Sequence, residues 1–198
     1  MKILIAGATG KTGRRLMGEL QAKGHTPIAL VRGSSDTSVL PQGAQTRTGD
    51  LTDLHEGVCQ DCDAVIFAAG SGGDTGEEMT RKVDREGAMR LVDLAAKSGV
   101  SRFVMLSSVG ADQPEQGGDM EHYLQAKHDA DEHLKASGLT YAILRPVRLT
   151  SEDGDRNMRF GEDVDAHASA ARGDVAAALA DAVDSEDWAN KTLLMQSA

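Results

Sequence analysis

Short apolar runs alternate with segments of helical periodicity along most of the chain. Residues 2–6 are apolar after one lysine, as expected for a strand that is buried on both faces. Leu16, Met17 and Leu20 then recur at helical spacing, and Gly24 ends that helix. The same reasoning predicts strands at 2–6, 27–32, 45–48, 64–69, 102–107 and 141–145. It predicts helices at 11–23, from Thr52 or Asp53 for a short stretch, at 78–97 and at 120–136.

Strands separated by helices predict right-handed βαβ units and a parallel sheet. Two successive βαβαβ halves give the Rossmann-type doubly wound fold, which is an α/β architecture. After Pro146 the pattern loosens into a polar loop at 150–163, a helix at 173–183 and a closing strand at 191–195. We therefore expect one compact domain over residues 1–198, with 147–198 as a small substrate-side portion at its C-terminal end.

Composition narrows the function classes. The chain has 198 residues, with 21 basic and 31 acidic side chains, a net charge of −10, and only 3% aromatic residues. Few aromatics and an acidic balance disfavour nucleic-acid binding, which needs basic surfaces and stacking platforms. Because the apolar runs are far shorter than the ~20 residues of a membrane span, and the first meets a Gly-rich turn, we expect a cytoplasmic protein without membrane contact. A monomer or a homodimer fits equally well.

The strongest motif is the glycine-rich segment from Gly7 to Gly13, GATGKTG, between the first strand and the first helix. Gly7 permits a tight turn, Gly10 lets backbone amides approach a pyrophosphate, and Gly13 allows close helix–strand packing. The pattern predicts a dinucleotide site with Gly7, Thr9, Gly10, Lys11, Thr12 and Gly13 among its cofactor-binding residues. A structural turn that binds no nucleotide is the alternative.

The end of the second strand favours NADP over NAD. An acidic residue there holds the ribose 2′-hydroxyl of NAD, whereas an arginine favours the 2′-phosphate of NADP. Here Arg32 ends the strand, Ser34 and Ser35 offer hydroxyl donors, and no acid follows until Asp36. A solvated arginine at a strand end is the alternative.

Two further strand ends should line the cofactor. Asp50 and Leu51 follow the third strand, where they could clamp an adenine amino group; a plain turn is the alternative. The fourth strand ends in the small residues Ala68, Ala69 and Gly70, which let a cofactor pass close to the backbone. Ser71, Gly72 and Gly73 then extend this turn into a flexible connection.

Candidate catalytic residues follow the fifth strand. Ser107 and Ser108 stand at its end, and Tyr123 and Lys127 lie four residues apart on the next helix, so the tyrosine and lysine share one face. A lysine beside a tyrosine lowers the pKa of the phenol, which could then pass a proton to or from a substrate oxygen while a nicotinamide exchanges hydride. A serine could hydrogen-bond the same oxygen. The alternative is an interfacial tyrosine with a solvated lysine.

No metal site is expected. Cys59 and Cys62 form a C-x-x-C pair, but zinc needs about four ligands and no second pair exists. The pair precedes an apolar strand rather than opening a helix, so we expect structural, reduced cysteines. Histidines 122, 128 and 133 lack the spacing of a metal motif.

Together these residues resemble an atypical short-chain dehydrogenase/reductase, in the NAD(P)-binding group that includes NmrA-like proteins and biliverdin/flavin reductase B. The resemblance covers essentially the whole chain. It rests on the Gly7–Gly13 loop and on LVR at 30–32, GDL at 49–51, DAV at 63–65, FVMLSS at 103–108, Tyr123/Lys127, LRP at 144–146 and RGDVA at 172–176.

The resemblance implies a role for several of these residues. In that group the glycine loop binds pyrophosphate, the arginine after the second strand binds the 2′-phosphate, and the Asp-Leu pair flanks adenine. Pro146, Val147 and Arg148 would line the nicotinamide side, and Ser107 and Lys127 would also contact the cofactor. Many members with the full catalytic set carry a larger C-terminal substrate domain than this chain, and some compact members bind cofactor without established catalysis.

The sequence thus predicts an NADP(H)-dependent oxidoreductase acting on a small carbonyl or similar acceptor. Tyr123 would be the acid/base, Lys127 would modulate its pKa, and Ser107 or Ser108 would hold the substrate oxygen. Two alternatives stay open: a redox-sensing or regulatory protein that binds NADP(H) without catalysis, and a flavin-type reductase. The short C-terminal segment disfavours a nucleotide-sugar epimerase or dehydratase.

Overall fold

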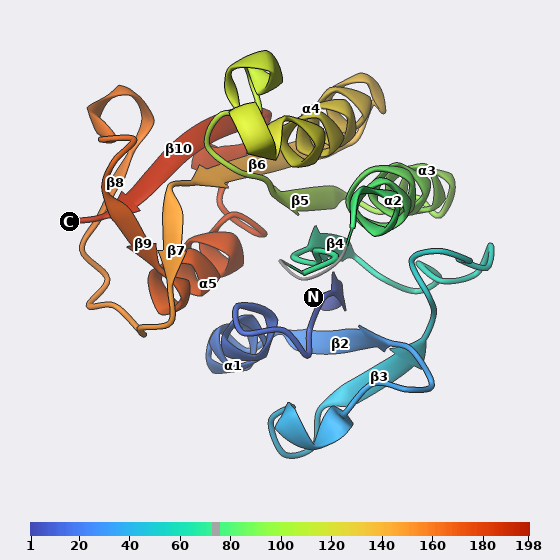
Figure 1. The fold of residues 1–198 in the computed structure, drawn as a ribbon. Coiled ribbons are helices and arrows are strands. Elements are labelled where there is room, and N and C mark those ends of the chain that lie inside the picture. The colour runs from blue at the N-terminus through green and yellow to red at the C-terminus, as the bar shows by residue number, and fades with distance from the viewer. Residues whose placement is uncertain (73–75) are drawn as a thin grey trace.

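An eight-stranded sheet forms the centre of the computed structural model, which describes residues 1–72 and 76–198 (Figure 1). The strand order is β3-β2-β1-β4-β5-β6-β10-β8. Its first six strands follow the doubly wound order, and their pairings are parallel, as the sequence predicts. The strands are β1 (Lys2–Ala6), β2 (Thr26–Val31), β3 (Gln45–Thr48), β4 (Ala64–Phe67), β5 (Arg102–Leu106), β6 (Thr140–Pro146), β8 (Met158–Phe160) and β10 (Lys191–Ser197).

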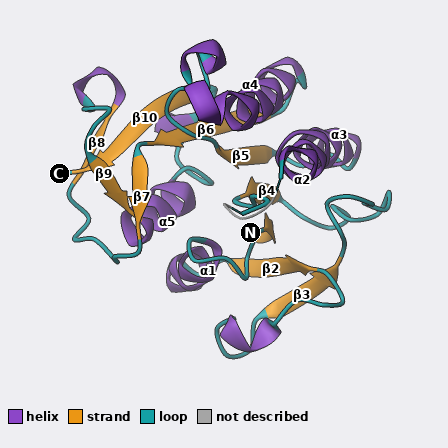
Figure 2. Cartoon of the chain, viewed as in Figure 1, coloured by secondary structure: helices purple, strands orange, loops and turns teal. Residues whose placement is uncertain are grey.

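Helices cover both faces of the sheet (Figure 2). They are α1 (Gly13–Ala22), α2 (Glu77–Thr80), α3 (Ala88–Lys97), α4 (Glu121–Ala136) and α5 (Arg172–Asp181), with a π-helical segment (Arg81–Gly87) between α2 and α3. Successive side chains of β1 point to opposite faces, so Ile3 and Ile5 join one core cluster with α1 and α5. Leu4 and Ala6 join the other, with α3 and α4. The continuous apolar run of β1 is therefore buried on both sides.

The C-terminal segment extends the sheet. β10 pairs in parallel with β6, and β8 pairs antiparallel with β10. Two short strands, β7 (Arg148–Thr150) and β9 (Ser169–Ala171), form a separate parallel pair near the carboxyl end of β6. Within the described ranges 1–72 and 76–198, no helix is long and apolar enough to cross a bilayer.

Two sequence predictions of local structure are wrong. Residues 51–60 form turns rather than a helix from Thr52 or Asp53. The Asp50 carboxylate accepts hydrogen bonds from the Thr52 amide (2.9 Å) and hydroxyl (2.8 Å), a local turn that competes with helix formation. The polar segment 150–163, expected to be a loop, contains β8, whose three residues are too few to show a strand pattern. Gly73 of the predicted flexible connection lies outside the described residues.

The first βα turn depends on two glycines. Gly7 has φ +86°, and a Cβ there would lie 2.6 Å from the carbonyl carbon of Ala68. At Gly13 a Cβ would lie 2.0 Å from the Gly7 carbonyl oxygen. The start of α1 therefore packs directly on the turn that precedes it, and no side chain fits between them.

We expect Gly13→Ala to lower the free energy of unfolding by at least about 2 kcal/mol, because the added methyl overlaps backbone that has no room to move. Gly18→Ala in the same helix is the matched control, since a Cβ there meets nothing within 4 Å. It should raise the free energy of unfolding by up to about 1 kcal/mol. Urea denaturation measures both, and equal stability of the two variants would contradict this packing.

Candidate functional site

A cavity of about 390 Å³ opens at the carboxyl ends of β1, β2 and β4. This edge of a doubly wound sheet is where such folds bind nucleotides. The lining includes half of the residues that the sequence predicted for a cofactor: Gly7, Thr9, Gly10, Arg32, Asp50, Leu51, Ala68, Ala69 and Gly70. It also includes Ser35, one of the two serines predicted as hydroxyl donors, and residues given no cofactor role from the sequence: Ala6, Leu30, Gly49, Ser71, Met79 and Val83.

The glycine loop presents only part of itself to this cavity. Thr12 and Gly13 are buried and Lys11 is exposed, and none of the three is among the lining residues. The Gly10 amide donates to the Gly7 carbonyl (3.0 Å), so it closes the turn. Lys11 and Thr12 directly precede α1. The first amides of a helix have no intrahelical acceptor, so amides at this end of α1 can bind a phosphate.

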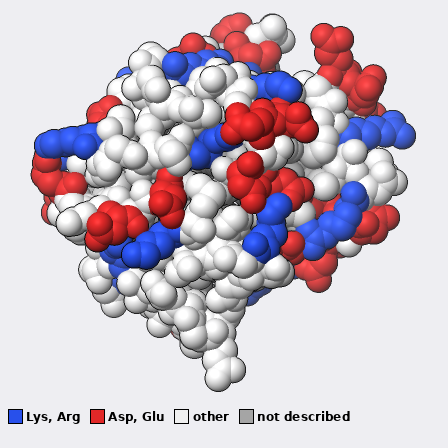
Figure 3. All heavy atoms as spheres, turned by 180° about the vertical axis from the view of Figure 1, so that it is seen from behind, with Lys and Arg blue, Asp and Glu red and all other residues white. Residues whose placement is uncertain are grey.

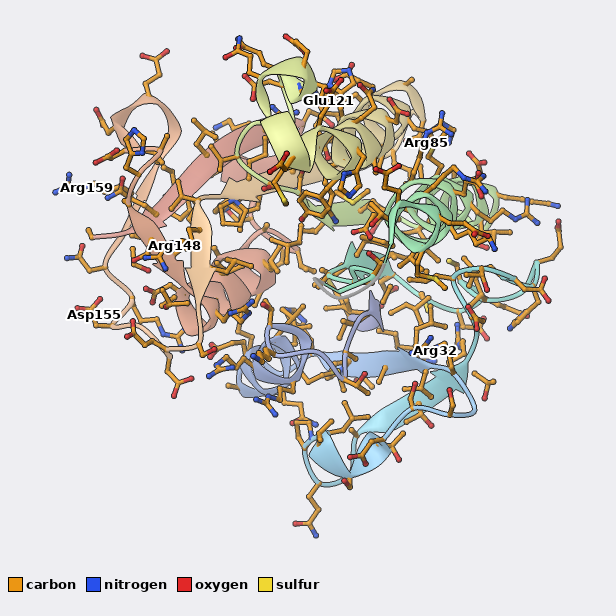
Figure 4. All side chains as sticks on the ribbon, in the orientation of Figure 1. Arg32, Arg85, Glu121, Arg148, Asp155 and Arg159 are labelled. Atoms are coloured by element: carbon orange, nitrogen blue, oxygen red, sulfur yellow. The ribbon has the colours of Figure 1, made fainter. Side chains whose placement is uncertain are left out.

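Arg32 and Asp50 bring opposite charges to the cavity. Figure 4 shows Arg32 beside β2. Hydrogen bonds from the Thr52 amide and hydroxyl lower the pKa of the Asp50 carboxyl, with a smaller contribution from the Arg32 charge. Ser34 is exposed and does not line the cavity; Ser35 does, and its hydroxyl accepts the Arg32 amide proton (3.0 Å). Of the two serines predicted as hydroxyl donors, the turn at 32–35 thus places Ser35 at the cavity and leaves Ser34 outside it.

A second cavity of about 810 Å³ continues from the first, with Gly70 and Ser71 lining both. It brings together the predicted residues Ser107, Ser108, Tyr123, Pro146, Val147 and Arg148. The end of β5, the first turn of α4, the end of β6 and the start of β7 all converge here. The remaining walls are Gly72, Gly76, Glu77, Thr80, Val109, Met120, His122, Leu149, Ala166 and Arg172.

Lys127 lies beneath Tyr123 rather than in the cavity wall. Its ammonium Nζ is 5.6 Å from the centroid of the Tyr123 ring and 3.0 Å from the Asp84 carboxylate oxygen Oδ1. The lysine side chain is 3% exposed and the aspartate 0%. Burial alone would lower the pKa of Lys127, but the adjacent Tyr123 and Asp84 charges raise it above its ordinary value. Lys127 therefore stays charged at neutral pH, paired with Asp84.

Asp84 is a site residue that the sequence analysis missed. It lies in the π-helical segment, and its other oxygen, Oδ2, accepts the Ser71 amide proton (2.9 Å) at the junction of the two cavities. π-Helical turns are frequent at functional sites. One feature of the sequence could have indicated Asp84. It is an acidic residue at helical spacing between Thr80 and Ala88, which are both buried.

A second buried acid fixes the end of β5. Asp131 on α4 accepts the Ser107 hydroxyl proton (2.7 Å) and pairs with the Arg145 guanidinium (2.9 Å). Burial raises the pKa of the Asp131 carboxyl above its usual range, and Arg145 opposes that rise. Because the Ser107 proton is held by Asp131, Ser108, which is only half-buried, is the better placed of the two serines to meet a substrate.

A family model described as NAD(P)H-binding matches residues 7–186. This chain belongs to the NAD(P)H-binding family. The family resemblance drawn from the sequence is thereby confirmed, and with it the class of cofactor, NAD or NADP.

Relatives of this NAD(P)H-binding protein carry different functional names. The Bacillus subtilis protein named an uncharacterized sugar epimerase, YhfK, is 36% identical over 197 residues, covering 96% of this chain and 92% of its own. A Bacillus halodurans structure named a candidate NAD-dependent epimerase/dehydratase has a TM-score of 0.92 at 37% identity, covering 100% of this chain and 94% of that one. The Lactococcus lactis oxidoreductase ylbE has a TM-score of 0.87 at 30% identity, covering 100% and 91%.

The two cysteines lie away from both cavities. Cys59 and Cys62 are free and buried, and an Arg47 guanidinium N–H donates to the Cys62 sulfur (3.2 Å). Burial raises the pKa of Cys59 to about 12 and that of Cys62 above its ordinary value. Within residues 1–72 and 76–198, no group of three or more His, Cys, Asp or Glu side chains could hold a metal ion.

We expect both thiols to resist iodoacetamide in the native protein. With a pKa of about 12 for Cys59, roughly one thiol in ten thousand is ionised at about pH 8, and the thiolate is the nucleophile. In urea both should be alkylated, which is the control. Mass spectrometry counts the added groups, and alkylation of the native protein at the rate of an exposed cysteine would contradict the burial.

Proposed function

We propose that this protein is an NADP(H)-dependent reductase that acts on a small carbonyl or a similar acceptor. The observation that carries the proposal is the continuity of the two cavities at Gly70 and Ser71. The first holds the groups suited to an adenosine and its phosphates, and the second holds a tyrosine, a serine and an apolar wall. A dinucleotide that spans both would place its reactive ring beside Tyr123.

The cofactor fits what the chain offers. The positive φ of Gly7, with no space for a Cβ, leaves bare backbone at the centre of the first cavity. Asp50 and Leu51 flank the adenine end, and Ala68, Ala69 and Gly70 form a smooth floor of small residues. Pro146 and Val147 supply a buried apolar surface at the other end. When bound, NADPH supplies the hydride.

Tyr123 is the proposed proton donor, and Ser108 is the proposed hydrogen-bond donor to the same substrate oxygen. Lys127 places its positive charge beneath the phenol ring, where it would favour the phenolate form, and Asp84 holds the lysine ammonium group in position. The same aspartate holds the Ser71 amide, so the position of Lys127 is coupled to the strip of backbone that both cavities share. Ser107, whose proton is held by Asp131, has a structural role in this scheme.

The name of the B. subtilis relative favours a second candidate, a sugar epimerase. An epimerase that oxidises and then reduces its substrate returns the hydride and consumes no cofactor overall. A reductase consumes one NADPH for each product molecule. One assay supplied with NADP+ and one supplied with NADPH therefore separate the two. Product formation with NADP+ and no net change in NADPH absorbance favours the epimerase, and loss of one NADPH per product molecule favours the reductase.

Arg32→Ala should narrow the preference for NADP(H) over NAD(H) by about ten- to a hundredfold, because one charge-assisted phosphate contact is worth roughly 1.5–3 kcal/mol. Calorimetry with each cofactor measures the ratio of dissociation constants. Arg159→Ala is the control, because Arg159 is exposed on β8 and lines neither cavity. Equal affinity of the unmutated protein for the two cofactors would overturn this assignment.

Tyr123→Phe should reduce reductase turnover by at least about a hundredfold, the contribution typical of a general acid, and leave NADPH affinity nearly unchanged. A panel of carbonyls and quinones with NADPH supplies the substrate. Tyr141→Phe is the matched control, since Tyr141 lies on β6, packs against the core and lines neither cavity. A Tyr123 variant as active as the unmutated protein would point to a flavin-type reductase. Tight NADPH binding with no turnover across the panel would favour a sensor.

A further inference from the structure

Arginines of this protein mostly contact carboxylates. Acidic side chains outnumber basic ones by 31 to 21, and both kinds are interspersed on the face seen from behind (Figure 3). The arginines that contact a carboxylate are Arg15, Arg81, Arg85, Arg90, Arg102, Arg145 and Arg156. In such an acidic chain, an arginine that lines a cavity and has no carboxylate partner is a candidate ligand for a bound anion.

Two such arginines line the second cavity. Arg148 begins β7 and is exposed; Arg172 begins α5 and donates one hydrogen bond, to the Thr150 carbonyl (2.9 Å). Among the described residues neither has an ion pair with a carboxylate. β7 and β9 pair in register, Thr150 with Ala171, so Arg148 begins one strand of this small sheet and Arg172 directly follows the other. Glu77, the acid of the described lining, belongs to α2 instead.

The lining of this cavity also includes apolar side chains. Leu149 follows Arg148 on β7, Ala166 precedes β9, Pro146 and Val147 lie at the end of β6, and Met120 directly precedes α4. Met120 is 52% exposed, which makes it one of the few large apolar side chains left open to solvent among the described residues. Exposed apolar groups that border a cavity commonly mark a binding surface, and a methionine adapts to varied shapes.

We propose that the substrate of this site is an organic anion: an apolar body, carrying the reducible group, with a carboxylate or phosphate held by Arg148 and Arg172. This rests on the proposed function, since it names the substrate class of the same site. The planar guanidinium of Arg148 offers two parallel N–H donors, which match either anion in a bidentate arrangement. Arg172 already holds β7 through Thr150 and adds a second positive charge.

The test is direct binding, which does not depend on catalysis. Calorimetry compares benzoate, phenyl phosphate and neutral benzamide, with the protein alone and with the protein saturated with NADP+. At least one anion should bind about tenfold or more tightly than benzamide, as expected for a charge-assisted contact. Whether benzoate or phenyl phosphate binds better distinguishes a carboxylate from a phosphate group.

Arg148→Ala and Arg148→Gln should each remove most of this anion preference and leave benzamide binding unchanged. Arg159→Ala removes an equally exposed arginine outside the cavity, labelled with Arg148 in Figure 4, and should preserve the preference. The proposal is overturned if neither anion binds more tightly than benzamide, or if the Arg159 variant loses as much as the Arg148 variants. It is also overturned if the Arg148 variants weaken NADP+ binding as strongly as anion binding.

An anion preference in the protein alone would stand even if NADP+ failed to bind, so the failure of the proposed function and the failure of this inference are distinguishable. A kinetic comparison then extends the result. With NADPH, 4-carboxybenzaldehyde should show a KM at least about tenfold below that of its methyl ester. Arg148→Ala should raise the KM of the acid at least about tenfold more than it raises the KM of the ester.

Discussion

The buried ion pair between Asp84 and Lys127 joins the parts on which the site depends. One carboxylate in the π-helical segment reaches the ammonium group of α4 and the amide of Ser71. Two charges without solvent are tolerated only when they satisfy each other, so removing either partner leaves an uncompensated buried charge. The ion pair and this hydrogen bond hold α4, which carries Tyr123, and the segment after β4 against the π-helical segment. Ser71, where the two cavities meet, lies in that segment after β4.

A second buried aspartate, Asp131, holds the other side of α4. Asp131 ties the helix to the end of β5 through Ser107 and to β6 through Arg145. The two aspartates together fix α4 against the carboxyl edge of the sheet, and Tyr123 at its first turn takes its position from both. The close contact of Gly13 with the Gly7 carbonyl does the same for α1, whose start adjoins the first cavity. Rigid supports on both sides are what the proposed hydride transfer would require of its protein.

Local signals made the sheet and the glycine loop predictable. A continuous apolar run such as 2–6 is read from its own residues, and the Gly7–Gly13 spacing identifies the first βα turn. The roles of Asp84 and Asp131 were not predicted, because each role depends on a partner on another element. Lys127, the partner of Asp84, lies 43 positions further along the chain. Of the two predicted serines only Ser35 lines the cavity, in a turn where its hydroxyl accepts the Arg32 amide proton. The helix expected from Thr52 is a turn, because the Asp50 carboxylate accepts two hydrogen bonds from Thr52.

The most direct test is a crystal structure of the complex with NADP+, with the distance measured from the nicotinamide C4 to the Tyr123 hydroxyl. If the two cavities form one dinucleotide site, the 2′-phosphate lies against Arg32 and the nicotinamide lies between Gly70 and Pro146. The measured distance is then within about 5 Å, the reach of a proton transfer with at most one bridging water. A nicotinamide ring outside the second cavity, away from Tyr123, would contradict the account.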